Sequence, residues 1–134
     1  ELLDGNSIAG GLIGYCDECA TLINCYALGN VSGSSYVGGL IGQMERQATL
    51  SNCYATGNVS SNNYGGGLIG YLIGGRRNVL TNCYATGDVT VKEQPSGEKY
   101  AGGLIGYGTS VDLTNCHTEG DVIVNETAGY HTYI

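Results

Sequence analysis

Cysteine is the most chemically versatile residue type of this 134-residue chain, which contains six cysteines. Two of them form a Cys-x-x-Cys motif, Cys16-Asp17-Glu18-Cys19, which occurs once. Such a motif can be half of a zinc site, a redox pair or a small disulfide loop. The chain has no second motif of this kind, and His117 and His131 are distant in sequence. We therefore expect Cys16 and Cys19 to form a local disulfide or to be two plain surface thiols.

The other four cysteines share one local context, each directly after an asparagine. They are Cys25, Cys53, Cys83 and Cys116. In a repeating fold they would stack in one inward row as small apolar side chains, because free cysteine is among the most buried residue types. Zinc or iron–sulfur binding needs thiolates that converge on one point, and a linear row does not converge. Disulfides between neighbouring repeats are the alternative, within narrow geometric limits. We predict no metal and no cofactor.

Carboxylates are the next candidates for chemistry, since 12 acidic residues stand against 5 basic ones. They are scattered over predicted turns and strand ends, where their usual role is a solvated surface. Asp88 and Asp121 occupy a position that Asn30 and Asn58 fill elsewhere, which indicates a turn role. A weak calcium site at that corner is the alternative. No set of acid, base and nucleophile is recognisable, so we predict no catalytic residue and no enzymatic activity.

Charge and hydropathy narrow the range of partners. The formal net charge of −7 opposes binding to a phosphate backbone, because no basic stripe could displace its counterions. No apolar run reaches the roughly 18 residues that a membrane-spanning helix needs. We expect no nucleic-acid partner and no membrane insertion.

The elements that must position these residues form a repeat. Gly-Gly-Leu-Ile-Gly begins at Gly10, Gly38, Gly66 and Gly102, and each copy is followed by an Asn-Cys-Tyr-Ala block or its weaker variant Asn-Cys-His-Thr. The starts are 28, 28 and 36 residues apart, a range typical of solenoids and propellers. A propeller blade needs about 40 residues. We predict an all-β, right-handed parallel β-helix (β-solenoid) of about four coils of roughly 28 residues, each with about three short strands.

One domain, residues 1–134, accommodates the repeats, which lie near 10–37, 38–65, 66–101 and 102–134. Both ends interrupt the repeat, so we expect a fragment of a longer protein. A leucine stands two positions before the asparagine of every repeat, and strict alternation from it would turn the asparagine and tyrosine inward. We therefore predict a bend at the asparagine, with Leu22, Cys25, Ala27 and Val31 inside and Tyr26 outside.

The bend asparagines should stack at one corner, with their side-chain amides bonding along the solenoid. They are Asn24, Asn52, Asn82 and Asn115. The outward tyrosines should form a ladder that supports neighbouring strands. They are Tyr26, Tyr54 and Tyr84. The functional alternative is an aromatic strip that binds a partner, because tyrosine is the only aromatic anchor in a chain without phenylalanine or tryptophan.

Two insertions break the repeat, within 73–78 and 91–99, and both are glycine-rich or polar. They belong at surface turns, where added length is tolerated. Their basic side chains are further candidates for partner binding: Arg76, Arg77, Lys92 and Lys99. The partner we expect for such a surface is a host glycan or an extracellular protein.

The blocks Gly-Gly-Leu-Ile-Gly-Tyr and Asn-Cys-Tyr-Ala-Thr-Gly-Asn-Val resemble the GLUG repeat, and the resemblance covers about residues 10–122. That repeat occurs in large bacterial cell-surface proteins, including adhesins and some immunoglobulin A-specific metalloendopeptidases. The resemblance implies a secreted or surface-anchored solenoid segment packed against neighbouring repeats of a parent protein. It does not carry over protease activity, because neither histidine lies in a His-Glu-x-x-His motif.

The function we expect is therefore a non-catalytic structural or adhesive segment, outside the cell or at its surface, that acts as a stalk or an adhesion module. The alternative is a β-helix carbohydrate-active enzyme that acts on polysaccharide, which requires several carboxylates meeting in one groove.

Overall fold

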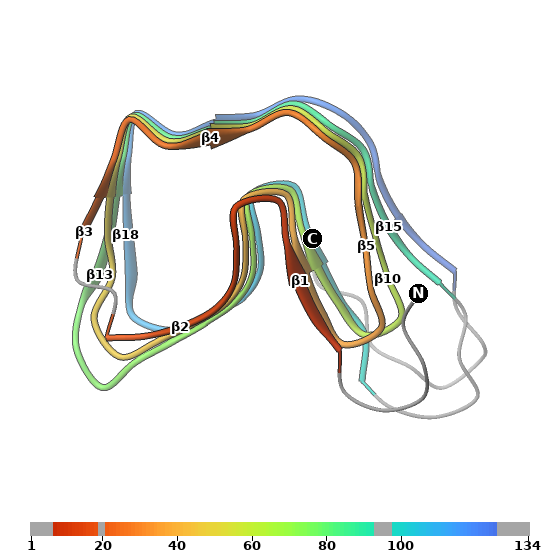
Figure 1. The fold of residues 1–134 in the computed structure, drawn as a ribbon, viewed down its shortest axis with the longest axis horizontal. Helices are drawn as coiled ribbons and strands as arrows, with labels where there is room; N and C mark the ends of the chain where they lie inside the picture. Colours follow the sequence, from red (N-terminus) through yellow and green to blue (C-terminus); the bar gives the residue numbers. More distant parts are fainter. Residues whose placement is uncertain (1–6, 19–20, 93–97, 126–134) are drawn as a thin grey trace.

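The computed structural model describes residues 7–18, 21–92 and 98–125, and this part of the chain is all-β. Twenty short strands form five parallel sheets of four strands each. Viewed along the stack, the four coils nearly superimpose (Figure 1). The predicted parallel β-solenoid of about four coils is confirmed, but each coil contains five short strands where three were predicted. Among the described residues, no helix is long and apolar enough to cross a membrane.

The five sheets are numbered here in the order in which the chain visits them. Sheet I comprises β1 (Ile8–Gly10), β6 (Tyr36–Gly38), β11 (Tyr64–Gly66) and β16 (Tyr100–Gly102). Sheet II comprises β2 (Ile13–Asp17), β7 (Ile41–Glu45), β12 (Ile69–Ile73) and β17 (Ile105–Gly108). Sheet III comprises β3 (Thr21–Ile23), β8 (Thr49–Ser51), β13 (Asn78–Thr81) and β18 (Val111–Thr114). Sheet IV comprises β4 (Tyr26–Ala27), β9 (Tyr54–Ala55), β14 (Tyr84–Ala85) and β19 (His117–Thr118). Sheet V comprises β5 (Val31–Ser32), β10 (Val59–Ser61), β15 (Val89–Val91) and β20 (Val122–Val124).

Register follows the repeat, so equivalent residues of successive coils are neighbours. Leu22 pairs with Leu50, and Leu80 pairs with both Leu50 and Leu113. In sheet V, Val59 pairs with Val31 and with Val89 in the same way. Each repeated residue type therefore becomes a row that runs along the solenoid axis.

The bend predicted between sheets III and IV is present at the asparagines. Asn24, Asn52, Asn82 and Asn115 have φ angles of 57°, 55°, 53° and 52°. This left-handed conformation is costly for most side chains and is tolerated by asparagine. The bend places Cys53 and Ala55 inward, where both are fully buried, and leaves Tyr54 outside.

The core consists of two clusters on either side of a segment that folds into the coil. The larger cluster contains the isoleucine of each glycine-rich block and the leucine of every block except the first, with the inward residues of sheets III and IV, such as Leu40, Leu50 and Cys53. The smaller cluster lies between sheets I and V and is built on Val37 and Val59. The predicted inward rows of leucine, cysteine, alanine and valine belong to these two clusters, except for Leu113, which is 52% exposed.

The segment that folds inward is the Gly-Gly-Leu-Ile-Gly block, which does not form a single strand. It turns back on itself between sheets I and II, and we call this feature the re-entrant turn; its strand stacks run side by side in the middle of the outline (Figure 1). Glycine allows the two sheets to meet backbone to backbone. A Cβ on Gly70 would lie 2.6 Å from the Val37 nitrogen and 2.7 Å from the Gly42 oxygen. No side chain fits between these strands, which explains the recurrent glycine.

The tip of the re-entrant turn contacts sheet IV from inside. A Cβ on Gly39 would lie 2.8 Å from the Ala55 Cβ, and one on Gly67 would lie 2.8 Å from the Ala85 Cβ. The second glycine of one block and the alanine of the other therefore recur together because they touch. The two sequence blocks of the repeat form one packing unit.

Candidate functional site

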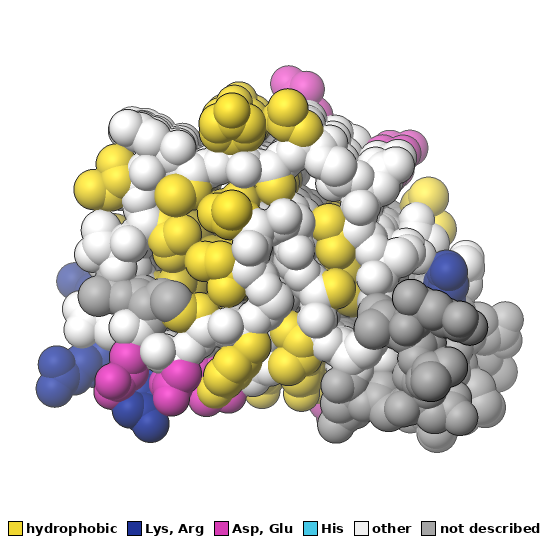
Figure 2. All heavy atoms as spheres, viewed as in Figure 1, with side chains coloured by type: hydrophobic (Ala, Val, Ile, Leu, Met, Phe, Trp, Pro, Cys, Tyr) yellow, Lys and Arg dark blue, Asp and Glu magenta, His cyan; other side chains and the backbone are white. Residues whose placement is uncertain are grey.

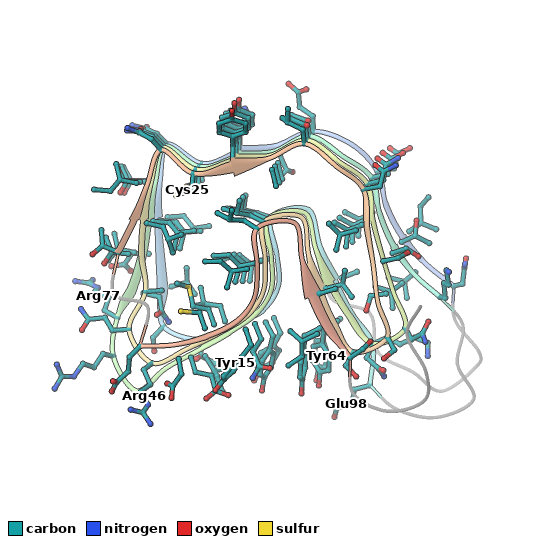
Figure 3. All side chains as sticks on the ribbon, in the orientation of Figure 1. Tyr15, Cys25, Arg46, Tyr64, Arg77 and Glu98 are labelled. Atoms are coloured by element: carbon teal, nitrogen blue, oxygen red, sulfur yellow. The ribbon has the colours of Figure 1, made fainter. Side chains whose placement is uncertain are left out.

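Tyrosines gather where sheets I and II diverge, at the open side of the re-entrant turn. Three of them come from sheet I and two from sheet II, and together we call them the tyrosine cluster: Tyr36, Tyr64, Tyr71, Tyr100 and Tyr107. Figure 3 shows Tyr15 and Tyr64 on opposite sides of this opening. Deep in the re-entrant turn, glycine allows the backbones of sheets I and II to touch. Where the two sheets separate, the tyrosine rings fill the space between them.

The rings of the tyrosine cluster contact one another both along the sheets and across them. Across the opening, Tyr36 and Tyr71 stack with centroids 4.5 Å apart, and Tyr100 meets Tyr107 edge to face at 5.1 Å. Along sheet I, Tyr64 and Tyr100 stack at 4.9 Å. Aromatic pairs at such separations are worth about 0.5–1.5 kcal/mol each beyond their burial. The cluster therefore joins sheet I to sheet II, within one coil through Tyr100 and Tyr107 and between successive coils through Tyr36 and Tyr71.

Two carboxylates border the tyrosine cluster. The Tyr100 hydroxyl donates to Glu98 over 3.0 Å, and the Tyr15 hydroxyl donates to Glu45 over 3.1 Å. Burial raises the pKa of Tyr64 well above its ordinary value, with Glu98 adding to the effect, and burial also raises the pKa of Tyr71. These phenols stay protonated at neutral pH, so the opening presents hydroxyl groups and negative charge.

Sequence reasoning did not identify the tyrosine cluster, although its signal was present. A tyrosine precedes the glycine-rich block by two positions in three repeats and follows it directly in three. Only the re-entrant path brings these two sets together.

The outward tyrosines of sheet IV form the expected ladder, and His117 continues it. Ring centroids are 5.1 Å apart for Tyr26–Tyr54, 4.8 Å for Tyr54–Tyr84 and 5.1 Å for Tyr84–His117, with interplanar angles of 6°, 1° and 10°. In such a stack each inner ring covers the faces of its neighbours. The lateral surface of the solenoid therefore presents ring edges and hydroxyl groups. Open ring faces remain only on Tyr26 and His117, the outermost rings of the described ladder.

Side-chain hydrogen bonds along the solenoid axis occur at a different corner from the predicted one. The Oδ1 atom of Asn30 accepts from the Asn58 backbone N–H over 2.8 Å. Asn58 accepts from Asp88 over 2.9 Å, and Asp88 accepts from Asp121 over 2.8 Å. We call this series the corner ladder.

At the bend asparagines the side chains are exposed, and within the described residues they make no hydrogen bond of this kind. Their left-handed φ angles form the bend, and the side chains are exposed at its outside. The amide bonding predicted for Asn24, Asn52, Asn82 and Asn115 is therefore wrong, and their role is conformational.

The four in-register cysteines are free thiols in an inward row. Cys53 and Cys83 are fully buried, whereas Cys25 and Cys116, in the end coils, are half-buried. The Cys83 thiol donates to the Thr81 carbonyl over 3.4 Å, and Cys53 donates to Ser51 over the same distance. Contact with the Cys53 side chain and burial raise the pKa of the Cys83 thiol. A protonated thiol in an apolar core is a packing group rather than a nucleophile.

Cys16 is buried and disulfide-bonded. Cys19, its expected partner, lies outside the described residues, so that pairing stays a prediction.

The basic residues proposed for partner binding have different environments. Arg76 is exposed beside an open hollow of about 530 Å³ that Glu18, Arg46 and Gln47 also line. Arg77 pairs with Asp112 on the next coil, and Arg46 pairs with Asp17 and Glu18 on the preceding one.

Two lysines flank the second insertion, of which residues 93–97 lie outside the described part of the chain. Lys92 is exposed, but Lys99 is only 1% exposed. Lys99 directly precedes β16, whose register on β11 places this end of the insertion against the preceding coil. Its assignment as a surface contact for a partner is therefore wrong.

Acidic and metal-ligating residues do not converge in the described part of the chain. No three His, Cys, Asp or Glu residues lie close enough together there to hold a metal ion. Asp17, Glu18 and Asp112 are engaged by arginines, and Asp88 accepts a backbone N–H. These residues act in turns and in contacts between coils.

The family model for the GLUG motif matches residues 33–60 and 61–90. These segments are GLUG repeats. Each matched segment runs from the corner before sheet I to sheet V, so one GLUG repeat corresponds to one coil of the solenoid with its re-entrant turn. No curated protein and no solved structure matches the chain.

Proposed function

We propose that this chain is a non-catalytic structural segment of a secreted or surface-anchored bacterial protein. In this role it is a stalk that spaces other domains, and adhesion to a host is a property of the whole protein. The GLUG repeats support this role, since the resemblance to bacterial surface proteins implies it. The location outside the cell or at its surface is part of the same proposal.

The observation that carries the proposal is that the repeated outward side chains contact their own equivalents. The tyrosine ladder of sheet IV covers its inner ring faces, and the corner ladder joins each coil to the next. Arg46 and Arg77 likewise pair with carboxylates on neighbouring coils. Side chains committed to neighbouring coils stabilise a rod, because each coil contacts only the coils beside it. They offer few unpaired groups to a ligand.

An adhesive role is the second candidate, and the tyrosine cluster is the observation that favours it. Its rings are partly exposed, Glu98 accepts from the Tyr100 hydroxyl, and Glu45 accepts from the adjacent Tyr15. Tyrosine is well suited to binding surfaces because it offers apolar contact and a hydrogen bond at low entropic cost. The partner would be a host glycan or a basic segment of an extracellular protein.

An array of glycans and extracellular-matrix proteins, probed with this chain, distinguishes the two candidates. The stalk role predicts no binding up to high micromolar concentration. Binding that Glu98→Gln weakens would favour adhesion through the tyrosine cluster, and binding that Tyr54→Thr weakens would assign it to the sheet IV ladder. Binding that Arg76→Ser weakens would assign it to the hollow at the first insertion.

The enzymatic alternative is tested separately with acidic and neutral polysaccharides. A carbohydrate-active enzyme needs a pair of carboxylates about 5–10 Å apart on either side of the scissile bond. Turnover that is lost on replacing a specific pair of carboxylates would overturn the non-catalytic proposal. The stalk role predicts no turnover with any substrate.

A further inference from the structure

We propose that the corner ladder is a site of N-linked glycosylation, with the side-chain amide of Asn30 or Asn58 as the acceptor of the first sugar. The modification lies on the side wall of the solenoid. It does not depend on the choice between the stalk and adhesive roles.

Two members of the corner ladder begin an Asn-x-Ser pattern. Asn30-Val31-Ser32 and Asn58-Val59-Ser60 are equivalent segments of successive coils, and their valines and serines pair in register. This pattern, with any residue but proline in the middle, is the acceptor for N-linked glycans at exposed positions. In the next coil Asp88 replaces the asparagine. The exposed bend asparagines lack the pattern, because a tyrosine or histidine stands two positions after each.

The amide nitrogens of these two asparagines are available for reaction. Both residues are exposed, and Figure 2 shows acidic side chains on the outer edge of the same corner, between sheets IV and V. The Oδ1 atoms of Asn30 and Asn58 accept backbone N–H groups of the next coil. Within the described residues no hydrogen bond engages either Nδ2 atom. In Asn63 and Asn78, which do not begin the pattern, Nδ2 donates to a backbone carbonyl.

The wall beside the two asparagines has room for a sugar. An open hollow of about 290 Å³ lies between the corner ladder and the outward hydroxyl groups of sheet V, among them Ser32, Ser60 and Thr90. Hydroxyl groups can both donate to and accept from the hydroxyl groups of a sugar. Successive coils are about 4.8 Å apart, so a sugar on one asparagine lies beside the other. We therefore expect most modified molecules to carry one glycan at this corner.

The transfer requires an activated sugar, whose donor class is a sugar joined through its C1 atom to a diphosphate on a lipid or a nucleotide. Nδ2 attacks C1, and the C1–N bond forms as the C1–O bond to the diphosphate breaks. The diphosphate leaves with that electron pair, and Nδ2 gives one of its two protons to a base of the transferase. Oδ1 is unchanged, so the product still accepts the backbone N–H of the next coil.

Site-resolved mass spectrometry of the protein isolated from the cells that produce it is the test. Peptides that contain Asn30 or Asn58 should gain the mass of one or more sugar residues, and fragmentation should place that mass on the asparagine. A third such pattern begins at Asn125, but its other residues lie outside the described part of the chain, so each site is mapped separately. Protein in which Asn30 and Asn58 are both unmodified would overturn the proposal.

Replacement of the two serines separates the acceptor pattern from the asparagines themselves. Ser32→Ala combined with Ser60→Ala should abolish the modification although both asparagines remain, whereas Ser32→Thr combined with Ser60→Thr should retain it. A glycan that persists in the alanine variant would refute recognition through this pattern. Blocking synthesis of the lipid-linked donor distinguishes the two donors: loss of the glycan assigns a lipid carrier, and persistence assigns a nucleotide carrier.

The folded coil must also accommodate the sugar. Circular dichroism of the modified and unmodified fractions should show the same strand content, and the modified fraction should unfold at an equal or higher temperature, because the bonds of the corner ladder remain. A glycan found only on chains that fail to fold would contradict the proposal.

Discussion

Gly70 offers the sharpest test of the backbone contact between sheets I and II. It lies in β12, and a Cβ at this position would approach three backbone atoms of the preceding coil: the Val37 nitrogen at 2.6 Å, the Val37 oxygen at 2.7 Å and the Gly42 oxygen at 2.7 Å. Gly70 does not have a positive φ. The substitution Gly70→Ala is therefore opposed by space alone and not by backbone conformation.

The size of the effect follows from these distances. Ordinary contact with a Cβ begins near 3.4 Å, so the two sheets would have to separate by about 0.7 Å in a close-packed region. Overpacking of this kind costs about 1–3 kcal/mol. The gain from a less flexible unfolded chain, about 0.4–1 kcal/mol, offsets only part of it. We expect Gly70→Ala to lower the free energy of unfolding by about 2 kcal/mol.

Gly75 provides the matched control in the same coil. A Cβ there meets nothing within 4 Å, and its φ is not positive. Gly75→Ala should therefore be neutral or stabilise the chain by about 0.5 kcal/mol. Thermal unfolding followed by circular dichroism should separate the two variants by roughly 10 °C for a chain of this size. Equal midpoints for the two variants would show that sheets I and II are not in backbone contact.

Two further predictions concern the bend and the tyrosine cluster. Asn52→Ala should cost about 1 kcal/mol because alanine disfavours the left-handed φ, while Asn52→Gly should be nearly neutral; equal losses in urea unfolding would assign Asn52 a side-chain contact instead. The raised pKa values of Tyr64 and Tyr71 mean that the folded state holds these protons more tightly than the unfolded state. The resulting stability is fully present below the ordinary tyrosine pKa of about 10 and is lost as pH rises above it. Urea unfolding between pH 8 and 11 should show this decline, with a smaller one in Tyr64→Phe, and an unchanged slope in that variant would contradict the assignment.

Much of the solenoid could be predicted because each coil repeats the same local sequence pattern. The spacing of the glycine-rich blocks indicated the period of the repeat. The leucine two positions before each asparagine predicted the bend, which the left-handed φ angles of the asparagines confirm. The inward rows followed from residue size and polarity, since the small Cys53 and Ala55 suit the core and Tyr54 does not.

The re-entrant turn was not predictable from the same pattern. An apolar run with glycines at both ends is typical of a buried strand, and hydropathy does not distinguish one strand from two that fold together. The decisive fact is that Gly70 touches Val37 of another coil, which is a long-range packing relation. Without that path, Tyr36 and Tyr71 are far apart in sequence and unconnected, so the tyrosine cluster was missed.

The bonding between coils was assigned to the wrong corner for a related reason. Asn24 and Asn30 both suit turns, and composition alone does not tell which side chain points along the axis. Backbone conformation decides it: the left-handed bend turns Asn24 outward, whereas Asn30 reaches the Asn58 N–H of the next coil. Lys99 was misplaced because a lysine beside an insertion is usually exposed, yet only 1% of it is exposed.

The re-entrant path, on which the core and the tyrosine cluster depend, is tested most directly by nuclear Overhauser effects between tyrosine rings in solution. Tyr36 and Tyr71 have ring centroids 4.5 Å apart across the opening, in different sheets and different coils. A strong cross-peak between their ring protons, together with one between Tyr100 and Tyr107, is the expected result. Cross-peaks that join Tyr36 only to Tyr64, and Tyr71 only to Tyr107, would indicate a solenoid without the re-entrant turn and would contradict the structure described.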